Sequence, residues 1–346
     1  MKPHHRPTIA VILVNLGTPD APTVPAVRRY LRQFLSDTRV VEIPPLLWAI
    51  ILNLFVLPIR SKRVAQAYAS IWDGDSPIRR ILFQQASALQ QRFDEQAERL
   101  PFKVQVCAAM TYGNPALSQV LDELSEQGVE QMVILPLYPQ YSASTTGAVF
   151  DGVARWGMGK RHLPAISFVK DYFAHPNYIQ ALADSVRRYQ AEHGKADKLL
   201  MSFHGIPKVN EDKGDPYTKQ CRYVAHKLAQ ALQLSEEEWS CAFQSRFGKQ
   251  EWVKPYTDVV LTEWGQHGVA SVQIISPAFS SDCLETLEEL VVENRHTFLH
   301  AGGQSYGYIP ALNADQAHID LLVELTMPHV SAWQQTLTGW GGCLNS

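Results

Sequence analysis

The sequence contains neither of the glycine-rich motifs that bind the phosphate groups of nucleotides. No G-x-G-x-x-G follows an apolar run, and no G-x-x-x-x-G-K-[ST] occurs in the 346 residues. These absences exclude a prediction of a nicotinamide-dependent dehydrogenase or a P-loop kinase. The net charge is only −3, and there is no lysine- or arginine-rich run. We therefore expect no nucleic-acid partner.

Cysteine is scarce, and its spacing forms no known pattern. No two cysteines form a C-x-x-C motif, so neither a zinc site nor a disulfide framework is predicted. The residues before Thr8 also lack the apolar stretch of a secretory signal peptide. Both observations favour a reducing, cytoplasmic setting. The five cysteines are Cys107, Cys221, Cys241, Cys283 and Cys343.

No apolar run reaches the roughly 18–20 residues that a transmembrane helix needs. The nearest approach is 46–57, which has prolines on both sides and is followed by Arg60, Lys62 and Arg63. One interpretation is a helix of the hydrophobic core. The other is an exposed apolar lip with a basic collar, which predicts a peripheral contact with a membrane surface or an apolar substrate.

Short apolar runs alternate with amphipathic stretches along most of the chain. This alternation predicts an α/β fold with parallel sheets that are flanked by helices. Continuous apolar runs such as Val-Ile-Leu support it, because parallel strands are buried on both faces. The expected strands are 10–14, 104–108, 132–137, 166–169, 199–203, 241–244 and 272–276. The expected helices include 81–100, 115–126, 177–192, 220–232 and 256–266.

The expected strands fall into two groups, which predicts two similar domains with a cleft between them. We place the first domain at 1–160 and the second at 161–330, followed by a tail at 331–346. The segment 151–164 is expected to cross from one domain to the other. A last helix at 314–327 is expected to pack back on the first domain.

A histidine stands where the apolar run 199–203 ends. Gly205 and Pro207 follow His204 at once, so the chain turns directly after the histidine. In open α/β sheets, ligands bind at the edge where the parallel strands end. A single histidine at a strand end is more often structural than catalytic, but the enforced turn favours an imidazole that acts as a base or metal ligand.

Acidic residues recur at helical spacing after another strand end. Glu285, Glu289 and Glu293 lie four residues apart and would form one ridge of an α-helix. Two plainer interpretations compete: Asp282 with Glu285 matches a variant of the capping box, and an acidic ridge is usually a solvated face. A cation bound along the ridge would explain why no basic residue between the glutamates offsets their repulsion.

Aromatic and hydroxyl side chains follow a further strand end. Tyr138, Tyr141 and Ser144 predict a rim that suits a flat, partly polar ligand, although serines here can equally cap the next helix. Trp252 suggests a similar rim from the second domain. Ser76, in a turn with two aspartates, is a further candidate for substrate binding.

Seven short motifs occur in order along nearly the whole chain. They are 13–19, 74–78, 138–147, 203–207, 214–217, 244–248 and 281–287. Each motif is weak alone, but the combination and its order are specific. The sequence resembles the ferrochelatase family, whose members are lyases that insert Fe²⁺ into protoporphyrin IX in haem biosynthesis. The resemblance implies formation of protohaem with release of two protons.

The resemblance also implies a fold and a site. It predicts two Rossmann-like domains with a porphyrin cleft between them. His204 matches the family's active-site histidine and Glu285 the facing glutamate, while Glu289 and Glu293 match an acidic ridge discussed as a metal path. The run 46–57 matches the apolar lip at the cleft mouth.

The chemistry of metallation gives these residues expected roles. We expect His204 to accept the pyrrole protons and Glu285 to help hold Fe²⁺. Glu289 and Glu293 would conduct iron or protons between the site and solvent. Binding the macrocycle in a distorted form would lower the barrier to insertion. Iron is a substrate in this scheme, and we expect no prosthetic group.

Two features depart from the family pattern. Many members carry histidine at the position of Cys283, and some bind a [2Fe-2S] cluster through a cysteine-rich tail. The tail of this sequence contains only Cys343, so we expect no iron–sulfur cluster. Two alternatives stay open: a related chelatase for another tetrapyrrole or metal, and a haem- or porphyrin-binding protein without turnover.

Overall fold

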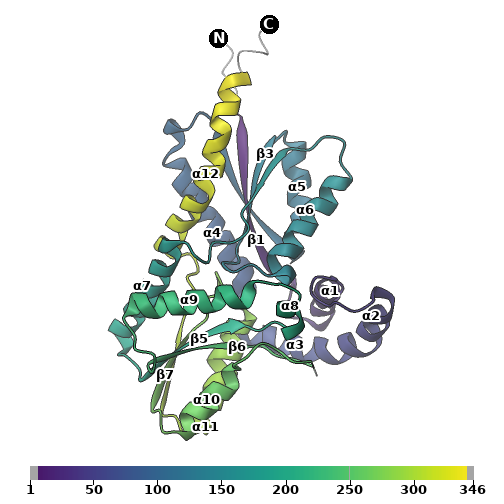
Figure 1. Ribbon diagram of the computed structural model, residues 1–346. Coiled ribbons are helices and arrows are strands. Elements are labelled where there is room, and N and C mark those ends of the chain that lie inside the picture. The colour runs from purple at the N-terminus through teal and green to yellow at the C-terminus, as the bar shows by residue number, and fades with distance from the viewer. Residues whose placement is uncertain (1–6, 249, 341–346) are drawn as a thin grey trace.

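Two four-stranded parallel sheets, each flanked by helices, make up the chain (Figure 1). The computed structural model describes residues 7–248 and 250–340, with side chains to residue 333. The first sheet has the strand order β2-β1-β3-β4 and the second the order β6-β5-β7-β8. The predicted α/β fold with two parallel sheets is confirmed.

The strands of the first sheet are β1 Thr8–Thr18, β2 Lys103–Gly113, β3 Gln131–Pro136 and β4 Ala165–Phe168. Those of the second are β5 Lys198–His204, β6 Trp239–Gln244, β7 Ser271–Ile275 and β8 Ser305–Ile309. The helices of the first half are α1 Val24–Leu35, α2 Pro45–Ile51, η1 Leu52–Val56, α3 Leu57–Ile71, α4 Pro77–Asp94, η2 Ala97–Arg99, α5 Leu117–Glu126, η3 Ala143–Gly147 and α6 Ala148–Met158. The remaining helices are α7 Pro176–His193, α8 Lys208–Asp212, α9 Tyr217–Leu232, α10 Thr257–Gln266, η4 Glu285–Asn294, α11 Arg295–His300 and α12 Gln316–Trp340.

The first sheet extends further along the chain than the sequence predicted. β4 pairs with β3, with Ile166 beside Met132, so it belongs to the first sheet although it lies beyond the expected boundary at residue 160. The expected crossover at 151–164 is instead the end of α6 and a loop inside the first half. The pattern of β4 identifies a strand, but only its tertiary pairing identifies the sheet that it joins.

The two halves repeat the same arrangement of strands and of the turns that follow them. The sequence X-Gly-X-Pro occurs at the carboxyl ends of both central strands, as Leu16–Pro19 at the end of β1 and as His204–Pro207 at the end of β5. A cis proline peptide follows both β2 and β6, at Pro115 and Pro255. A π-helical turn follows both β3 and β7. At the position where the second half carries its histidine, the first half therefore carries the apolar Leu16.

One hydrophobic core links the two halves. A single cluster of buried side chains contains Val11 and Leu135 of the first sheet together with Met201 and Ile275 of the second. The last helix, α12, runs alongside the first sheet and α4 (Figure 1), where Asp320 pairs with an arginine of α4. It is longer than the expected 314–327 and includes part of the expected tail. The two sheets are thus held in one orientation.

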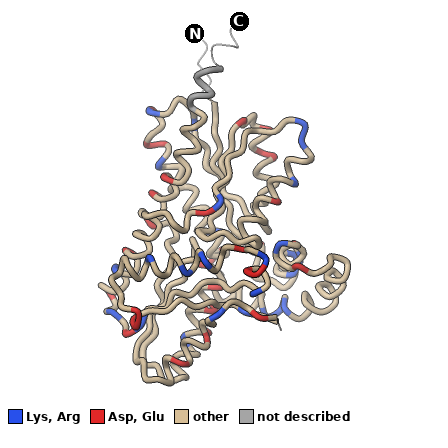
Figure 2. The backbone as a smooth tube through the Cα atoms, viewed as in Figure 1, with Lys and Arg blue, Asp and Glu red and all other residues tan. Residues whose placement is uncertain are grey.

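The apolar run 46–57 lies in a helical segment that projects beside the two sheets (Figure 1). The helix runs without interruption over Pro45–Ile71, and the π-helical turn η1 stands directly before Pro58, where a proline ring disturbs an α-helical turn. α2 has no buried residue, so the interpretation as a core helix is wrong there. Among the described helices, this segment is the one that is long and apolar enough to cross a membrane. Residues 45–57 of this segment carry no charge, whereas acidic and basic residues intermix elsewhere (Figure 2).

Because one core links both halves, the protein should unfold in a single step. Replacing the fully buried Leu135 with alanine should lower the free energy of unfolding by about 2–5 kcal/mol. Urea unfolding followed by far-ultraviolet circular dichroism and by tryptophan fluorescence measures this. The control Leu46→Ala, at an exposed position, should change it by less than about 0.5 kcal/mol. Two separate transitions would contradict the shared core.

Candidate active site

His204 is held at the end of β5 by the turn that follows it. The amide of Gly205 donates to the carbonyl of Gln244 over 2.8 Å. A Cβ atom at position 205 would lie 2.7 Å from that carbonyl oxygen and 3.2 Å from the Trp252 ring. Only glycine permits this approach, and the approach fixes the direction in which His204 leaves the strand.

The environment of His204 favours a neutral imidazole. Its ring meets Phe279 edge-on, with the ring centroids 6.2 Å apart. Burial lowers the pKa of His204, and the nearby Glu285 carboxylate offsets only part of this effect. Within the described part of the chain, no group hydrogen-bonds its buried Nδ1 atom. The site therefore presents an unpartnered ring nitrogen next to a carboxylate.

Glu285 begins the π-helix η4, and its carboxylate is not committed to capping that helix. The capping-box interpretation is wrong, because the Asp282 amide donates to Asn313 Oδ1 over 2.8 Å instead of to the Glu285 carboxylate. The Asp282 carboxylate instead accepts hydrogen bonds from the Tyr308 hydroxyl over 2.6 Å and from Asn313 Nδ2 over 2.8 Å. The Thr286 hydroxyl donates to it over 3.1 Å. These bonds anchor the start of η4, where the charge of Glu285 acts on His204.

The other two glutamates of the predicted ridge have separate partners. Glu289 accepts the Ser245 amide over 2.7 Å and also pairs with the Ser245 hydroxyl. Burial nevertheless raises the pKa of Glu289 to about 7. Glu293 is more exposed and lies 3.4 Å from Arg63 on α3. No three acidic, histidine or cysteine side chains of the described residues cluster as a ready metal site, so the ridge is a row of individual carboxylates.

A cavity of about 570 Å³ lies at the outer part of this row. Glu289 and Glu293 line it together with Ser245, Asp258 and His296, whereas Glu285 does not. The cavity thus gives an approach to Glu289 from the side away from His204.

Three of the predicted substrate-binding residues have buried polar groups. Ser76 is 1% exposed, and its hydroxyl accepts a hydrogen bond from Thr18 over 2.7 Å. Trp252 is 5% exposed and donates its ring N–H to the Phe247 carbonyl over 2.9 Å. The Tyr138 hydroxyl is buried, and the Glu285 carboxylate contributes to raising the Tyr138 pKa after burial itself.

Tyr141 lies in the loop before η3 and Ser144 lies in η3, close to where this segment meets the second half at Asp215. The Asp215 carboxylate accepts the Ala143 amide over 2.8 Å and the hydroxyl of the serine before it over 3.0 Å. The Tyr141 ring lies 5.2 Å from the ammonium of Lys170. Two of the sequence motifs, 138–147 and 214–217, are therefore neighbours in space.

Sequence reasoning missed a pair of tyrosines that complete the site. Tyr30 of α1 and Tyr68 of α3 meet edge-on, with ring centroids 6.4 Å apart. Burial raises the pKa of both hydroxyls, and the negative charge of Glu285 raises each further. We call these two residues the tyrosine wall. They lie more than two hundred residues before Glu285, so no local pattern connects them to it.

A model of the family described as ferrochelatase matches residues 8–330. The chain belongs to the ferrochelatase family. Ferrochelatase from Psychrobacter cryohalolentis is 65% identical over 98% of this chain and 100% of its own length. Ferrochelatase from Acinetobacter baumannii strain ACICU is 57% identical over 96% of this chain and 98% of its own. The predicted resemblance is confirmed.

Solved structures share the fold at much lower identity. The sirohydrochlorin chelatase SirB from Bacillus subtilis subspecies spizizenii, in complex with cobalt, has a TM-score of 0.52 at 10% identity. The match covers 94% of this chain and 96% of that one. SirB from Bacillus subtilis with Fe³⁺ has a TM-score of 0.51 at 12% identity, covering 92% and 95%. These likenesses confirm a chelatase-like, two-sheet fold.

Full-length identity of 54–65% to ferrochelatases also confirms the predicted activity. The protein is a lyase of haem biosynthesis that inserts ferrous iron into protoporphyrin IX. Iron and porphyrin are its substrates and haem is its product.

The pKa of Glu289 makes stability depend on pH. Burial raises this pKa from 4.5 to about 7, so the native state binds the proton more tightly than the unfolded chain. The stabilisation is complete below pH 4.5 and is lost as pH rises through 7. Relative to the wild type, Glu289→Gln should therefore gain about 1–3 kcal/mol between pH 4.5 and pH 8. Urea unfolding at both pH values measures this, and an unchanged difference would contradict the shift.

Proposed function

We propose that His204 accepts the pyrrole protons of the bound porphyrin while Glu285 holds the incoming ferrous ion. The observation that carries this proposal is the buried, unpartnered Nδ1 atom of a neutral imidazole beside a carboxylate. A neutral imidazole is a competent base near pH 7. Imidazole and carboxylate together are also suitable transient ligands for Fe²⁺, and they leave coordination positions open for the porphyrin nitrogens.

The acidic row supplies a route for ions between this pair and solvent. Glu289 has a pKa of about 7, so it can both take and release a proton near neutral pH. Beyond it, Glu293 and the outer cavity open towards solvent. We assign Glu289 and Glu293 to the passage of protons or iron along η4, as the ridge in the sequence suggested.

Porphyrin binding is assigned to the walls of the same cleft. Tyr138, Tyr141 and Ser144 form the rim that we assign to contact with the macrocycle. The tyrosine wall, Ser76 and Trp252 are buried, so we assign them to supporting this rim from behind. On α3, Arg60 lies 5.1 Å from the Phe247 ring, where its charge would suit a carboxylate of the porphyrin.

We also propose that the apolar lip, residues 46–57, rests on a membrane surface. Leu46 is 86% exposed and Leu54 is 65% exposed, and Ile59 continues the same apolar surface. The other side of this helix packs on α1 through Leu57 and Tyr68, so the helix is held to the protein and inserts only its outer side chains. Porphyrin and haem are themselves apolar and would enter and leave from such a surface.

We also propose that the protein binds neither an iron–sulfur cluster nor a nucleic acid. The described cysteines lie on separate elements, at Cys107, Cys221, Cys241 and Cys283. Cys343 and the end of the tail lie outside the described residues. Cys283 is buried, and its thiol pKa is raised by burial and by Glu285, so it acts as a neutral packing residue next to the site.

Replacing His204 with alanine should lower anaerobic iron insertion by about 10²–10⁴-fold, because no base remains for the pyrrole protons. Porphyrin binding, measured by fluorescence quenching without iron, should persist. The exposed His267→Ala variant is the matched control and should turn over normally. Normal turnover of His204→Ala would overturn the assignment of the base.

Replacing Leu46, Leu54 and Ile59 together with serine should lower the binding of the protein to anionic vesicles by at least about tenfold, because the apolar contact is lost. Co-sedimentation with phosphatidylglycerol–phosphatidylcholine vesicles measures it. A triple serine variant at Phe150, Met158 and Leu163, which are also exposed, is the control. Equal binding of both variants would contradict a specific lip contact.

A further inference from the structure

The lip and the tyrosine wall belong to one excursion of the chain from the first sheet. The chain leaves the sheet after Thr18, forms α1, α2, η1 and α3, and returns at Ser76 before α4. The two ends of the excursion lie side by side, because the Thr18 hydroxyl donates to the Ser76 hydroxyl over 2.7 Å. Both side chains are buried. We call these two adjacent ends the base of the excursion. The contacts that hold the base together therefore set the positions of the lip and of the tyrosine wall.

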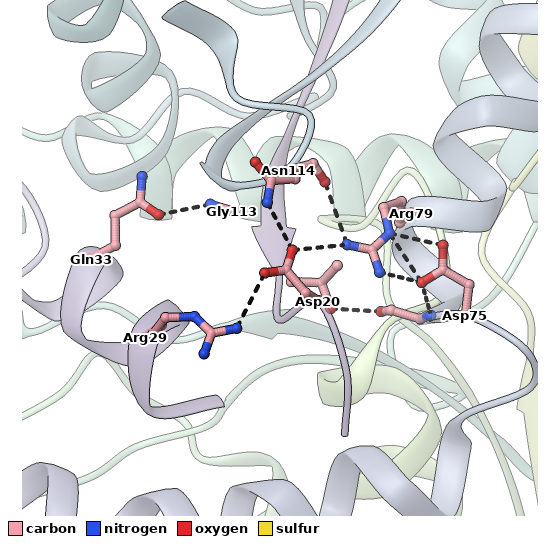
Figure 3. A network of polar contacts seen from close by, with 9 residues as sticks. Asp20, Arg29, Gln33, Asp75, Arg79, Gly113 and Asn114 are labelled. Carbon is pink, nitrogen blue, oxygen red and sulfur yellow. Dashed lines mark hydrogen bonds and ion pairs between the residues drawn. The ribbon is translucent and has the colours of Figure 1, made fainter. Parts of the chain in front are cut away.

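Arg79, in the first turn of α4, bridges both ends of the excursion (Figure 3). Its Nε donates to Asp75 over 2.8 Å at the returning end. Its Nη1 lies 3.9 Å from Asp20 at the leaving end and 3.5 Å from the Asn114 carbonyl. The Asn114 side chain in turn donates to Asp20 over 2.9 Å, and Arg29 of α1 lies 3.6 Å from the same carboxylate.

We call the contacts of Arg79 with Asp75 and Asp20 the clamp. Its geometry requires a guanidinium. Only 11% of the Arg79 side chain is exposed, so its charge is compensated by the two carboxylates rather than by solvent. The planar fork of arginine meets acceptors on two sides at once, whereas a lysine ammonium is a single point on a flexible stem. The Asp75 carboxylate also accepts a hydrogen bond from the Ser76 amide. This contact connects the Arg79 guanidinium to the hydrogen bond between Thr18 and Ser76.

This base connects to the active site through the tyrosine wall. The Tyr30 hydroxyl donates to the carbonyl of Gly17 over 3.2 Å, next to Thr18. The Thr18 hydroxyl also interacts with Tyr68. Leu284, the residue before Glu285, packs against the cluster of side chains that contains Tyr30 and Tyr68. The contacts therefore run from Arg79 through the tyrosine wall to the start of η4.

We infer that Arg79 is a positioning residue for porphyrin binding. By pairing with Asp20 and Asp75 it closes the base of the excursion 19–75 and holds the tyrosine wall against the start of η4. Arg79 itself touches neither substrate nor reacting atoms. The inference rests on the proposed assignment of the tyrosine wall to porphyrin binding, and it does not depend on which group accepts protons.

Iron-free fluorescence titration with protoporphyrin, combined with steady-state iron insertion, tests this role. Arg79→Met should raise the porphyrin Kd and KM by about tenfold while kcat changes less than about twofold, because the wall moves but the chemical groups remain. Arg79→Lys should recover part of the affinity. The control Arg92→Met, which removes an ion pair from the same helix, should behave as the wild type.

A double substitution separates positioning from general destabilisation. In a Tyr68→Ala background, Arg79→Met should add much less than its single effect on Kd, because the two residues act through one wall. Independent, fully multiplicative effects would overturn the inference, as would wild-type affinity in Arg79→Met. If Arg79→Met does not fold, Asp20→Asn at the half-exposed end takes its place, and wild-type porphyrin affinity in both Asp20→Asn and Arg79→Lys would overturn the inference. Porphyrin binding is measured here without iron and without turnover. It therefore tests the role of Arg79 even if His204→Ala retains turnover and the proposed base is wrong.

Discussion

The proposed active site depends on the parallel pairing of β5 with β7. With Met201 beside Ile275, both strands run in the same direction and end at the same edge of the second sheet. The chain leaves β5 at His204, and after β7 it enters the π-helix that begins at Glu285. Without this pairing, the imidazole and the carboxylate would have no reason to be neighbours.

Hydrogen bonds between the two halves hold the first half against the segments around Glu285. Asn15 of β1 donates to the Ser281 hydroxyl over 3.1 Å, and both side chains are buried. Ser281 lies shortly before Glu285 in the chain. Gln85 of α4 donates to the Asn313 carbonyl over 2.9 Å, near the anchor of η4. In the proposed site, the second half contributes the imidazole and the carboxylate, and the first half contributes aromatic side chains.

Much of the fold could be predicted because its signals are local. Continuous apolar runs mark the buried strands, and a turn directly after His204 marks a strand end that faces a ligand. The ridge of Glu285, Glu289 and Glu293 was visible from spacing alone. Spacing could not show that the helix is π-helical or that Asp282 anchors it through distant partners, so the capping box was wrong.

The sequence by itself determined the α/β class, the strand that ends at His204 and the carboxylate at Glu285, since each follows from neighbouring residues. Only the tertiary structure decided that β4 joins the first sheet, that Ser76 is buried and that the cluster with the tyrosine wall packs on Leu284, next to Glu285. These features depend on contacts between segments far apart in the chain. The same hydroxyl or aromatic side chain can line a ligand or support a turn, and packing alone determines which it does.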